Sequence, residues 1–375
     1  MSAVSSSSDH SPIFVFAGGG SGGHLYPGLA IADELKRLHP EIRSHFVCSD
    51  RDIDRQILAH AGASWTPLQM PTAGRLWRQP WRQCPNFWRA WREAVNLLRG
   101  HSQAIVVGTG GFVSVPVVLA ACWMRRPVVL LEPNVVPGRA TTVLQRFTQL
   151  VCTGFPETAE GLRRSTPLLN TGIALRTELT SGATGNDLAV RPRQILVLGG
   201  SQGAAELNEL VLRAVQEDSS LFAGWTIRHQ VGSGGVERAR EIYEAAGVTA
   251  DVQTFFDPIA DAYRSSQLVI SRAGATSLAE FACAGLPAVL VPHRQAVRNH
   301  QHANAVLFSK AGAAVVVAGS TEGERLAELR TGLKGLLGDE NLRTSCSLAM
   351  RQQARPHAAA DIAAALMHLV ESVAC

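Results

Sequence analysis

The sequence predicts an α/β protein with two Rossmann-like, doubly wound domains that face each other across a cleft. Apolar, strand-like runs alternate with helix-like segments along the chain, which is the pattern of parallel strands covered on both faces. A strand, a serine-containing glycine turn and a helix also follow one another at the start of each half. The length agrees, because 375 residues are too many for one typical domain and suit two.

The expected strands are short, continuous apolar runs. In the first half they are IFVFA (13–17), SHFVCS (44–49), AIVV (104–107), PVVLL (127–131) and LVCT (150–153). In the second half they are QILVLGG (194–200), WTIRHQV (225–231), LVISRAG (268–274) and PAVLVP (287–292). The uncharged stretch 104–124 imitates a membrane span, but three glycines and Pro116 interrupt it. We therefore expect a strand at 104–107, a glycine turn and a helix there.

These elements divide the chain into an N-terminal domain, residues 1–175, and a C-terminal domain, residues 176–354. The polar stretch 177–194 is interpreted as the linker. A last helix, at about 355–375 with its body at 358–373, could join either domain on its pattern alone.

The composition predicts a cytosolic enzyme rather than a disordered or fibrous chain, because 46% of the residues are hydrophobic and 18% are charged. The net charge of +4 is mild and does not indicate a nucleic-acid partner. Seven scattered cysteines without a C-x-x-C pair predict buried free thiols, not disulfides or zinc ligands. Residues 1–12 lack the features of a signal peptide and are interpreted as a disordered polar tail.

The two glycine turns give the first indication of function. GGGSGG (18–23) follows the first strand, and GGSQGA (199–204) follows the first strand of the second half. Glycine permits a close backbone approach, and the helix that follows directs N–H groups and its positive dipole end at a ligand, which is usually a phosphate. The alternative is a tight strand-to-helix turn without a ligand.

Gly18, Gly20 and Gly23 also match the G-x-G-x-x-G spacing of a dinucleotide site, with an aspartate at 50 or 52 available for a ribose. Three features oppose NAD. His24 directly follows the last glycine, Pro27 lies in the first helical turn, and one dinucleotide does not need the second glycine turn. Neither turn is a Walker A motif.

The SDRDID stretch (49–54) has the D-x-D spacing that holds a divalent metal in metal-dependent sugar transferases. Arg51 and Arg55 interleave with its aspartates. This favours a solvated loop that neutralises its own charge over a metal site.

Six segments in order resemble the MurG family, the bacterial UDP-N-acetylglucosamine:undecaprenyl-pyrophosphoryl-muramyl-pentapeptide N-acetylglucosaminyltransferases. They are AGGGSGGHLYPGLAIADEL (17–35), GTGGFVSVPVVLAA (108–121), LLEPNVVPGRA (130–140), LGGSQGAAELN (198–208), SRAGATSLAEFACAGLPAVLVP (271–292) and NHQHANA (299–305). The resemblance implies a GT-B fold and an inverting transfer of GlcNAc from UDP-GlcNAc to the C4 hydroxyl of MurNAc in lipid I, giving lipid II. It also implies that no metal or cofactor is needed and that the last helix returns to the N-terminal domain.

The family also implies where such a chain acts. We expect a peripheral protein on the cytoplasmic face of the bacterial inner membrane. UDP-GlcNAc, lipid I, an anionic membrane surface and other cell-wall or division proteins are the expected partners, and nucleic acid is not.

Two residues are candidate catalytic bases. His24 would lie at the cleft beside the acceptor hydroxyl, and imidazole, with a reference pKa of about 6.5, suits proton transfer at neutral pH. Its alternative role is to fix the turn. Glu132 is the second candidate, and its alternative role is that of a structural loop carboxylate.

The resemblance also implies the binding residues. The second glycine turn and Arg176 would hold the donor diphosphate, Glu280 the ribose, the Phe256 backbone the uracil, and two amide side chains the sugar. The donor set is Ser21, Gly22, Gly23, Asn134, Arg176, Ser201, Gln202, Gly203, Phe256, Ala275, Thr276, Ser277, Leu278, Ala279, Glu280 and Gln301. The acceptor-side set is Gly18, Gly19, Gly20, Gly108, Gly110 and Gly111. Residues 21–23 would serve the lipid pyrophosphate as well, and the alternative for 108–111 is close packing of a strand against a helix.

The chain departs from the family pattern at several of these segments. The family's His-Glu-Gln-Asn is Leu-Glu-Pro-Asn at 131–134, and its Gly-Asn-Pro-Val-Arg is Gly-Ile-Ala-Leu-Arg at 172–176. Its Gly-Gly-Tyr ends here in Phe112, and the acidic pair before His-Gln is here Arg298 and Asn299. These changes affect the sugar and acceptor contacts more than the diphosphate turn.

A tryptophan- and arginine-rich stretch occupies residues 75–92, with four of the seven tryptophans between positions 77 and 91. Trp beside Arg is typical of proteins that rest on an anionic leaflet. A helical spacing of apolar residues runs from Phe87 through Trp88 and Trp91 to position 98. It predicts instead that Trp88 and Trp91 lie on the buried face of a helix. Trp77 and Trp81 are therefore the membrane candidates.

Three other functions are possible for such a chain. A UDP-sugar epimerase can share the fold but would need neither a lipid acceptor nor the tryptophan stretch. A non-catalytic lipid-presenting subunit would not need a donor half. A dehydrogenase would have to bind NAD.

Overall fold

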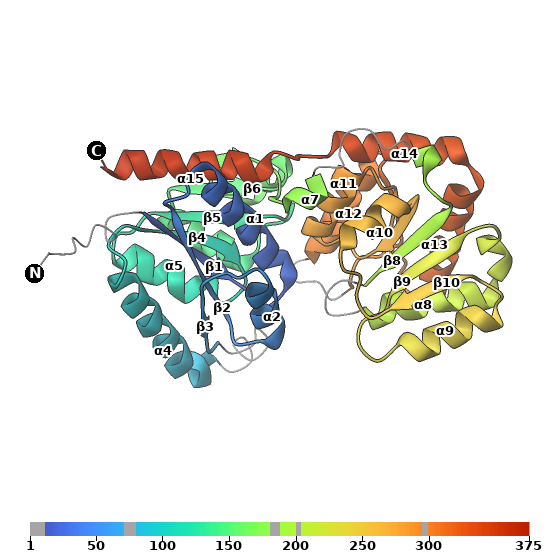
Figure 1. The fold of residues 1–375 in the computed structure, drawn as a ribbon, viewed down its shortest axis with the longest axis horizontal. Coiled ribbons are helices and arrows are strands. Elements are labelled where there is room, and N and C mark those ends of the chain that lie inside the picture. The colour runs from blue at the N-terminus through green and yellow to red at the C-terminus, as the bar shows by residue number, and fades with distance from the viewer. Residues whose placement is uncertain (1–11, 71–79, 181–187, 200–203, 295–298, 375) are drawn as a thin grey trace, which may run out of the picture. The chain divides into compact units, whose positions relative to one another are not determined.

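The computed structural model describes residues 12–70, 80–180, 188–199, 204–294 and 299–374, without the side chains of 80–83, 373 and 374. The chain forms two compact units (Figure 1). Unit 1 comprises Met1–Arg176 and His357–Cys375, and unit 2 comprises Thr177–Pro356. The expected polar tail at 1–12 lies, but for Pro12, outside the described residues.

Unit 1 contains a seven-stranded sheet in the order β3-β2-β1-β4-β5-β6-β7, in which every neighbouring pair is parallel. Its strands are β1 (Ile13–Gly18), β2 (Arg43–Ser49), β3 (Trp65–Leu68), β4 (Ala104–Gly110), β5 (Val128–Glu132), β6 (Leu150–Thr153) and β7 (Leu168–Asn170). The apolar side chains of these strands alternate between two core clusters, one on each face of the sheet.

The helices of unit 1 cover both faces of this sheet. On one face lie α1 (Gly22–Leu38), α2 (Asp52–His60) and α15 (Ala358–Ala374), and on the other lie α4 (Pro80–Arg99), α5 (Ser114–Trp123) and α6 (Arg139–Leu144). Short 3₁₀ turns follow at Gln145–Phe147 and Pro156–Gly161. The last helix, α15, lies along α1, and its Ile362, Ala363 and Leu366 complete the core on that face (Figure 1).

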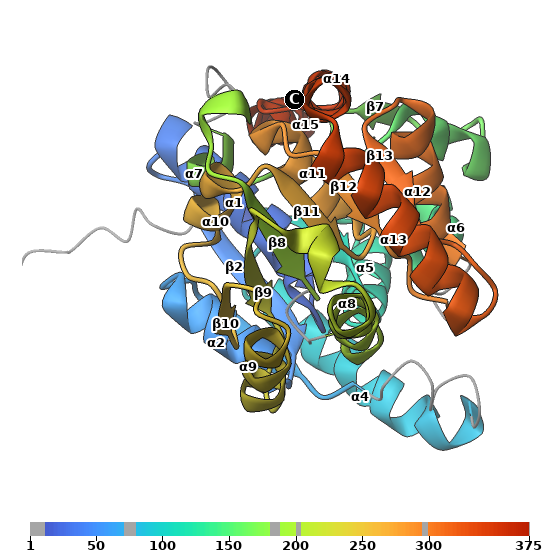
Figure 2. The same ribbon diagram turned by 90° about the vertical axis from the view of Figure 1, so that its right-hand side faces the viewer.

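Unit 2 contains a six-stranded parallel sheet in the order β10-β9-β8-β11-β12-β13 (Figure 2). Its strands are β8 (Gln194–Leu198), β9 (Thr226–Gln230), β10 (Ala250–Gln253), β11 (Leu268–Ser271), β12 (Ala288–Leu290) and β13 (Ala314–Val316). Its helices are α7 (Thr177–Thr180), α8 (Ala205–Glu217), α9 (Val236–Ala245), α10 (Ile259–Ser265), α11 (Ala275–Ala284), α12 (His300–Lys310), α13 (Glu322–Gly338) and α14 (Glu340–Gln352), with 3₁₀ turns at Leu188–Val190 and Ser219–Phe222.

The strand order reverses at one point in each sheet. The chain leaves β1 toward β2 on one side and returns to β4 on the other, and β8 has the same relation to β9 and β11. Ligands of open α/β sheets bind beyond the carboxyl ends of the strands at such a switch point. The switch points therefore direct attention to the turns after β1 and β4 and after β8 and β11.

The prediction of two parallel α/β domains is confirmed, as are the strand, turn and helix predicted over 104–124. The stretch 177–194, predicted to be a linker, contains the short helix α7 and a 3₁₀ turn, and residues 181–187 lie outside the described part.

Three predictions about side-chain environment are wrong in part. Trp88 was predicted to face the core but is 58% exposed. Helix α4 packs on α5 through a different stripe, of small and aliphatic residues that include Ala90 and Ala94. Asp54 is buried, not solvated, because it accepts hydrogen bonds beneath the first glycine turn. Cys84 is exposed and Cys122 half-buried, whereas the other four described cysteines are buried.

His229 on β9 predicts a pH dependence of stability. Its ring nitrogens lie 2.9 Å from the Tyr243 hydroxyl and 3.2 Å from Asn208 Oδ1 inside unit 2, and burial lowers the pKa of His229 from 6.5 to about 3. The folded state therefore excludes a proton that the unfolded state binds, so stability is fully present above pH 6.5 and is lost as the pH falls toward 3. We expect a loss of about 3 kcal/mol between pH 7 and pH 4 from this group.

Denaturant unfolding at both pH values checks this expectation. The variant His229→Gln cannot titrate and should lose less stability on acidification than the unmodified chain. Equal losses in the two proteins would contradict the assignment of the pH dependence to His229.

Candidate functional site

The switch point of unit 1 brings the first glycine turn next to the turn after β4. Gly18 at the end of β1 pairs with Gly110 at the end of β4, after an irregularity in the ladder. Gly20, Gly110 and Gly111 have φ values of 87°, 110° and 76°, which L side chains rarely adopt. Both turns lead directly into helices, α1 and α5.

Glycine is also required here because the two turns pack against each other. A Cβ on Gly111 would lie 2.7 Å from the Gly19 carbonyl oxygen, and one on Gly110 would lie 2.7 Å from His24 Nδ1. Gly108 lies within β4, where a Cβ would be 2.7 Å from the Leu130 side chain, and this supports the packing alternative for that residue. Because Gly110 and Gly111 carry no side chains, the end of β4 and the turn after it leave room for His24.

His24 is half-buried in the first turn of α1. Its Nδ1 lies 3.1 Å from the Thr109 carbonyl oxygen at the end of β4. A carbonyl oxygen can only accept a hydrogen bond, so Nδ1 carries the proton in this contact and the basic lone pair of the neutral imidazole is on Nε2. This tautomer suits a general base whose ring is held by its other nitrogen.

Glu132 lies at the carboxyl end of β5 and is buried. Its carboxylate accepts hydrogen bonds from the backbone and side-chain nitrogens of Asn134, at 3.1 and 3.2 Å, from the Gly138 N–H at 2.8 Å and from the Thr141 hydroxyl at 2.6 Å. Four donors close the loop from β5 to α6 around this one carboxylate, which supports the structural alternative for Glu132. Glu132, Gly23 and Thr109 line a common hollow of about 20 Å³ at this edge of the sheet.

Arg176 and Asn134 also belong to unit 1. The Arg176 guanidinium stacks on the ring of Tyr26 in α1, with 4.5 Å from its central carbon to the ring centroid. Asn134 uses its side chain on Glu132, so its amide helps to shape the loop after β5.

The switch point of unit 2 presents the N-terminal ends of α8 and α11. Gly199 directly follows β8, and Ser201, Gln202 and Gly203 lie outside the described residues. Ser271 at the end of β11 donates its hydroxyl to the Leu198 carbonyl at 3.0 Å, which ties the two strand ends together. Helix α11 begins after the extended Gly274, with Ala275, Thr276 and Ser277 in its first turn.

Glu280 occupies the second turn of α11 and is half-buried. The Tyr263 hydroxyl, from α10, donates to Glu280 Oε2 at 2.6 Å, which orients the carboxylate. The neighbouring Leu278 is fully buried and its N–H bonds to the Gly274 carbonyl, so its role is packing. Ala279 is half-buried beside it.

The other predicted donor residues of unit 2 are engaged in local contacts. Phe256 is buried and its N–H donates to Gln230 Oε1 at 3.1 Å. Gln301, in the first turn of α12, accepts from the His293 N–H at 2.9 Å. Arg298 lies outside the described residues.

A charged cluster at the switch point of unit 2 was not found from the sequence. Glu206, in the first turn of α8, accepts hydrogen bonds from Arg272, directly after β11, at 3.2 Å and from the buried Arg325 of α13. Burial favours the neutral acid, but the two guanidinium charges outweigh it and hold the pKa of Glu206 below its usual value. The available signal was the charged Arg272 within the otherwise uncharged run 268–274 that was predicted as a strand. Arg325 lies 119 residues from Glu206 and gave no signal.

Among the described residues, no group of three or more His, Cys, Asp or Glu side chains could hold a metal ion. The prediction that the chain needs no metal and no cofactor stays a prediction. In the same part of the chain, no helix combines the length and the apolar character that crossing a bilayer requires.

Comparisons with known proteins agree with this geometry. Residues 14–153 match the glycosyltransferase family 28 N-terminal domain, and residues 194–360 match its C-terminal domain. The chain is 35% identical over 361 residues, 92% of this chain and 94% of the relative, to the UDP-N-acetylglucosamine--N-acetylmuramyl-(pentapeptide) pyrophosphoryl-undecaprenol N-acetylglucosamine transferase of Nitratidesulfovibrio vulgaris.

Two solved structures are also similar. MurG of Acinetobacter baumannii superposes with a TM-score of 0.74 and 27% identity, over 95% of this chain and 99% of that one. A putative UDP-N-acetylglucosamine 2-epimerase from Listeria monocytogenes has a TM-score of 0.67 at 15% identity, over 96% and 98%, and shows the fold alone. The chain therefore belongs to the MurG family of glycosyltransferases.

Proposed function

We propose that the chain transfers GlcNAc from UDP-GlcNAc to the C4 hydroxyl of MurNAc in lipid I, with inversion at the anomeric carbon, to give lipid II. Family membership supports the substrates, because the relatives are named for this transfer. The observation that carries the proposal for this chain is His24, held through Nδ1 by the Thr109 carbonyl at the switch point of unit 1.

His24 is the proposed catalytic base. As the acceptor oxygen bonds to C1 of GlcNAc, its proton passes to His24 Nε2 while the bond between C1 and the diphosphate oxygen breaks. UDP leaves with the bonding electron pair. Glu132, saturated by four donors, is proposed to shape the loop after β5 instead of acting as the base.

Unit 2 is proposed to hold the donor. The N-terminal ends of α8 and α11 offer backbone N–H groups and positive dipole ends to the diphosphate. Arg176, which belongs to unit 1, stays a predicted contact of the diphosphate. Glu280, oriented by Tyr263, is placed on the helix that the nucleotide would contact, and its two oxygens can accept from two ribose hydroxyls. The backbone N–H groups and positive ends of the two helices stabilise the negative charge that develops on the leaving UDP.

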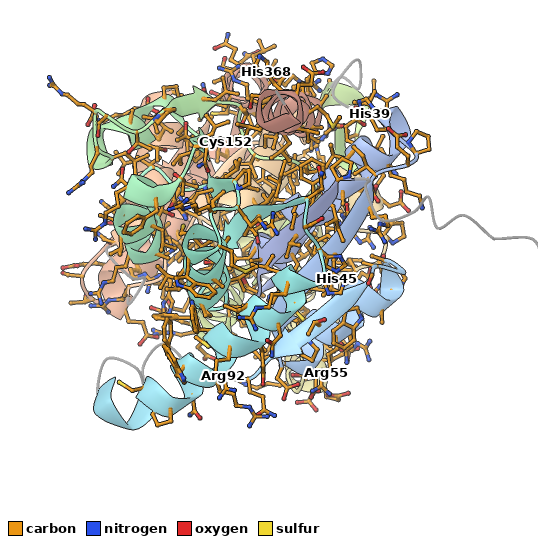
Figure 3. The ribbon with its side chains drawn as sticks, turned by 90° about the vertical axis from the view of Figure 1, so that its left-hand side faces the viewer. His39, His45, Arg55, Arg92, Cys152 and His368 are labelled. Carbon is orange, nitrogen blue, oxygen red and sulfur yellow. The ribbon has the colours of Figure 1, made fainter. Side chains whose placement is uncertain are left out.

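Exposed aromatic side chains support peripheral contact with a membrane. Trp88 of α4 stacks on Trp91 with centroids 4.7 Å apart, and Trp91 meets Trp123 of α5 edge-on at 5.4 Å. Trp88 and Trp123 are 58% and 60% exposed. Exposed arginines flank them in sequence, including Arg92 on α4 (Figure 3). We propose that this tryptophan cluster, Trp88, Trp91 and Trp123, contacts the anionic inner leaflet where lipid I resides.

Of the earlier membrane candidates, Trp77 and the side chain of Trp81 lie outside the described residues, so they stay predictions. The cytoplasmic face of the inner membrane is part of the present proposal. The expectation of cell-wall and division proteins as partners also stays a prediction.

The tryptophan cluster predicts a binding result. The double variant Trp88→Ser, Trp123→Ser should bind vesicles containing phosphatidylglycerol about tenfold or more weakly, because it removes large aromatic surfaces from the interface. Leu348→Ser is the matched control, since Leu348 is 59% exposed on α14 of unit 2. Unchanged sedimentation of the double variant with vesicles would contradict the assignment.

The transfer itself is tested with labelled UDP-GlcNAc and a short-chain lipid I analogue in the presence of EDTA. The proposal predicts acceptor-dependent incorporation of label. Conversion of UDP-GlcNAc to UDP-ManNAc without the acceptor would indicate an epimerase, and UDP binding without either reaction would indicate a non-catalytic subunit.

A further inference from the structure

We propose that Asp54 is a positioning residue for the acceptor side: its buried carboxylate sets the conformation of the Gly18–Ser21 turn and thereby the place of His24. This inference rests on the proposed function only in assigning the turn to the acceptor. The hydrogen bonds that carry it lie entirely within unit 1.

Asp54 of α2 is fully buried beneath the first glycine turn. Its two oxygens lie 3.0 and 2.8 Å from the Gly20 nitrogen, which donates its N–H to them. Oδ2 also accepts from the Ser49 N–H at 3.1 Å and from the Ser49 hydroxyl at 2.5 Å. The donors of these hydrogen bonds are two backbone N–H groups and one hydroxyl, all of them neutral. A buried carboxylate needs such donors, so the arrangement is strongly constrained.

Both backbone polar groups of Gly20, its N–H and its carbonyl, are held by side chains of the 51–54 segment. Asp54 accepts from its N–H, and Arg51 Nη1 donates to its carbonyl oxygen at 3.1 Å. Gly20 has a φ of 87°, a conformation that glycine adopts without the strain of a side chain. The neighbouring Gly19 lies against the same carboxylate. A Cβ at this position would collide with the Asp54 side chain and would lie 3.0 Å from the Ser49 nitrogen, so the turn requires glycine here.

This clamp reaches His24 in two steps. The His24 N–H donates to the Ser21 carbonyl at 3.2 Å, directly after the clamped residue. On the other side, the Gly19 carbonyl faces Gly111 in the turn after β4, and the end of β4 directly before that turn supplies the Thr109 carbonyl that holds the imidazole. A shift of the Gly19–Gly20 segment therefore moves His24 relative to the end of β4 and the turn that follows it.

The clamp also changes the role of Gly20. Its N–H is directed at Asp54, so Gly20 serves the acceptor through the shape of the turn and not as an amide donor to the lipid pyrophosphate. The carboxylate beneath the turn is part of the acceptor site's architecture, although it does not touch the substrate.

The test compares Asp54→Asn with Asp52→Asn, a matched change of an exposed aspartate in the same helix. The amide that replaces the buried carboxylate has no negative charge, and its NH2 group takes the place of one oxygen. If that oxygen is Oδ1, the NH2 and the Gly20 N–H are two donors facing each other, and all the donors then share one oxygen, which weakens the hold on the turn. We expect kcat/KM for the lipid I analogue to fall about 10- to 100-fold, because a small misplacement of a catalytic group is costly. The Kd for UDP, bound by unit 2, should match that of the unmodified chain, and D52N should match it in all parameters.

Ser49→Ala is the second variant, which keeps the carboxylate and removes only the hydroxyl donor. It should lower kcat/KM for the acceptor in the same direction by a smaller factor, and it keeps the inference testable if D54N does not fold. Equal losses in acceptor kcat/KM and UDP affinity, or an unchanged acceptor kcat/KM in folded D54N, would overturn the positioning role.

A readout without turnover separates this inference from the proposed function. The rate at which diethyl pyrocarbonate modifies His24, followed by peptide mass, should differ in D54N and be unchanged in D52N. If the unmodified chain binds UDP but transfers no GlcNAc, the proposed function fails while this rate still tests Asp54. An unchanged rate in D54N would contradict the inference even if transfer is observed.

Discussion

Replacing His24 by alanine is expected to lower kcat for GlcNAc transfer by about 10²- to 10⁴-fold, the usual contribution of a positioned general base. The reason is geometric. The Thr109 carbonyl, 3.1 Å from Nδ1, fixes the ring and leaves Nε2 as the basic atom. Steady-state kinetics with a lipid I analogue measure the effect, and the Kd for UDP should be unchanged because unit 2 is untouched.

His39→Ala serves as the matched control, since His39 is the residue directly after α1 and its side chain is 39% exposed. It should retain normal kcat. A His24→Ala enzyme with near-normal turnover would contradict the assignment of the base, and an equal loss in both variants would attribute the effect to α1 as a whole.

Replacing Glu280 by glutamine is expected to reduce kcat/KM for UDP-GlcNAc by about 10- to 100-fold, because hydrogen bonds to a charged acceptor are stronger than neutral ones. The effect should lie mainly in the KM for the donor. The KM for the lipid I analogue should not change. Tyr263→Phe, which removes the hydroxyl that orients Glu280 Oε2 at 2.6 Å, should give a smaller loss in the same direction.

A donor analogue sharpens this prediction. UDP-GlcNAc with a 2′-deoxyribose lacks one of the hydroxyls that Glu280 would accept from, so the unmodified chain should lose affinity for it. The Glu280→Gln variant should discriminate much less between the two donors. Equal discrimination by both proteins would show that Glu280 does not contact that hydroxyl.

The inner strands of both sheets were predictable because parallel strands covered on two faces are continuous apolar runs. The strands that the apolar runs did not single out, β3, β7, β10 and β13, are the four edge strands, and each has only three or four residues. An edge strand has one neighbour and less burial, so its composition is closer to that of a loop. The edge position, which only the assembled sheet defines, explains why these strands were missed.

The site was predictable where its signal is local in sequence. His24 follows the glycines directly, and both turns were recognised from glycine content. Asp54 was misinterpreted because its main partner, Gly20, lies 34 residues away, and the D-x-D spacing with interleaved arginines suggested a solvated loop. Trp88 was misassigned because helical spacing does not define which flank of an apolar stripe faces the core. Ala90, Ala94 and Leu98 supply that face.

The most direct test of the central claim is the structure of the product. NMR of the product from ¹³C-labelled UDP-GlcNAc and the lipid I analogue identifies both the anomeric configuration and the oxygen that receives the sugar. We expect one new β-linked GlcNAc on O4 of MurNAc, formed with release of UDP. An α linkage, transfer to another oxygen, or an epimerised nucleotide sugar in place of the disaccharide would contradict the account.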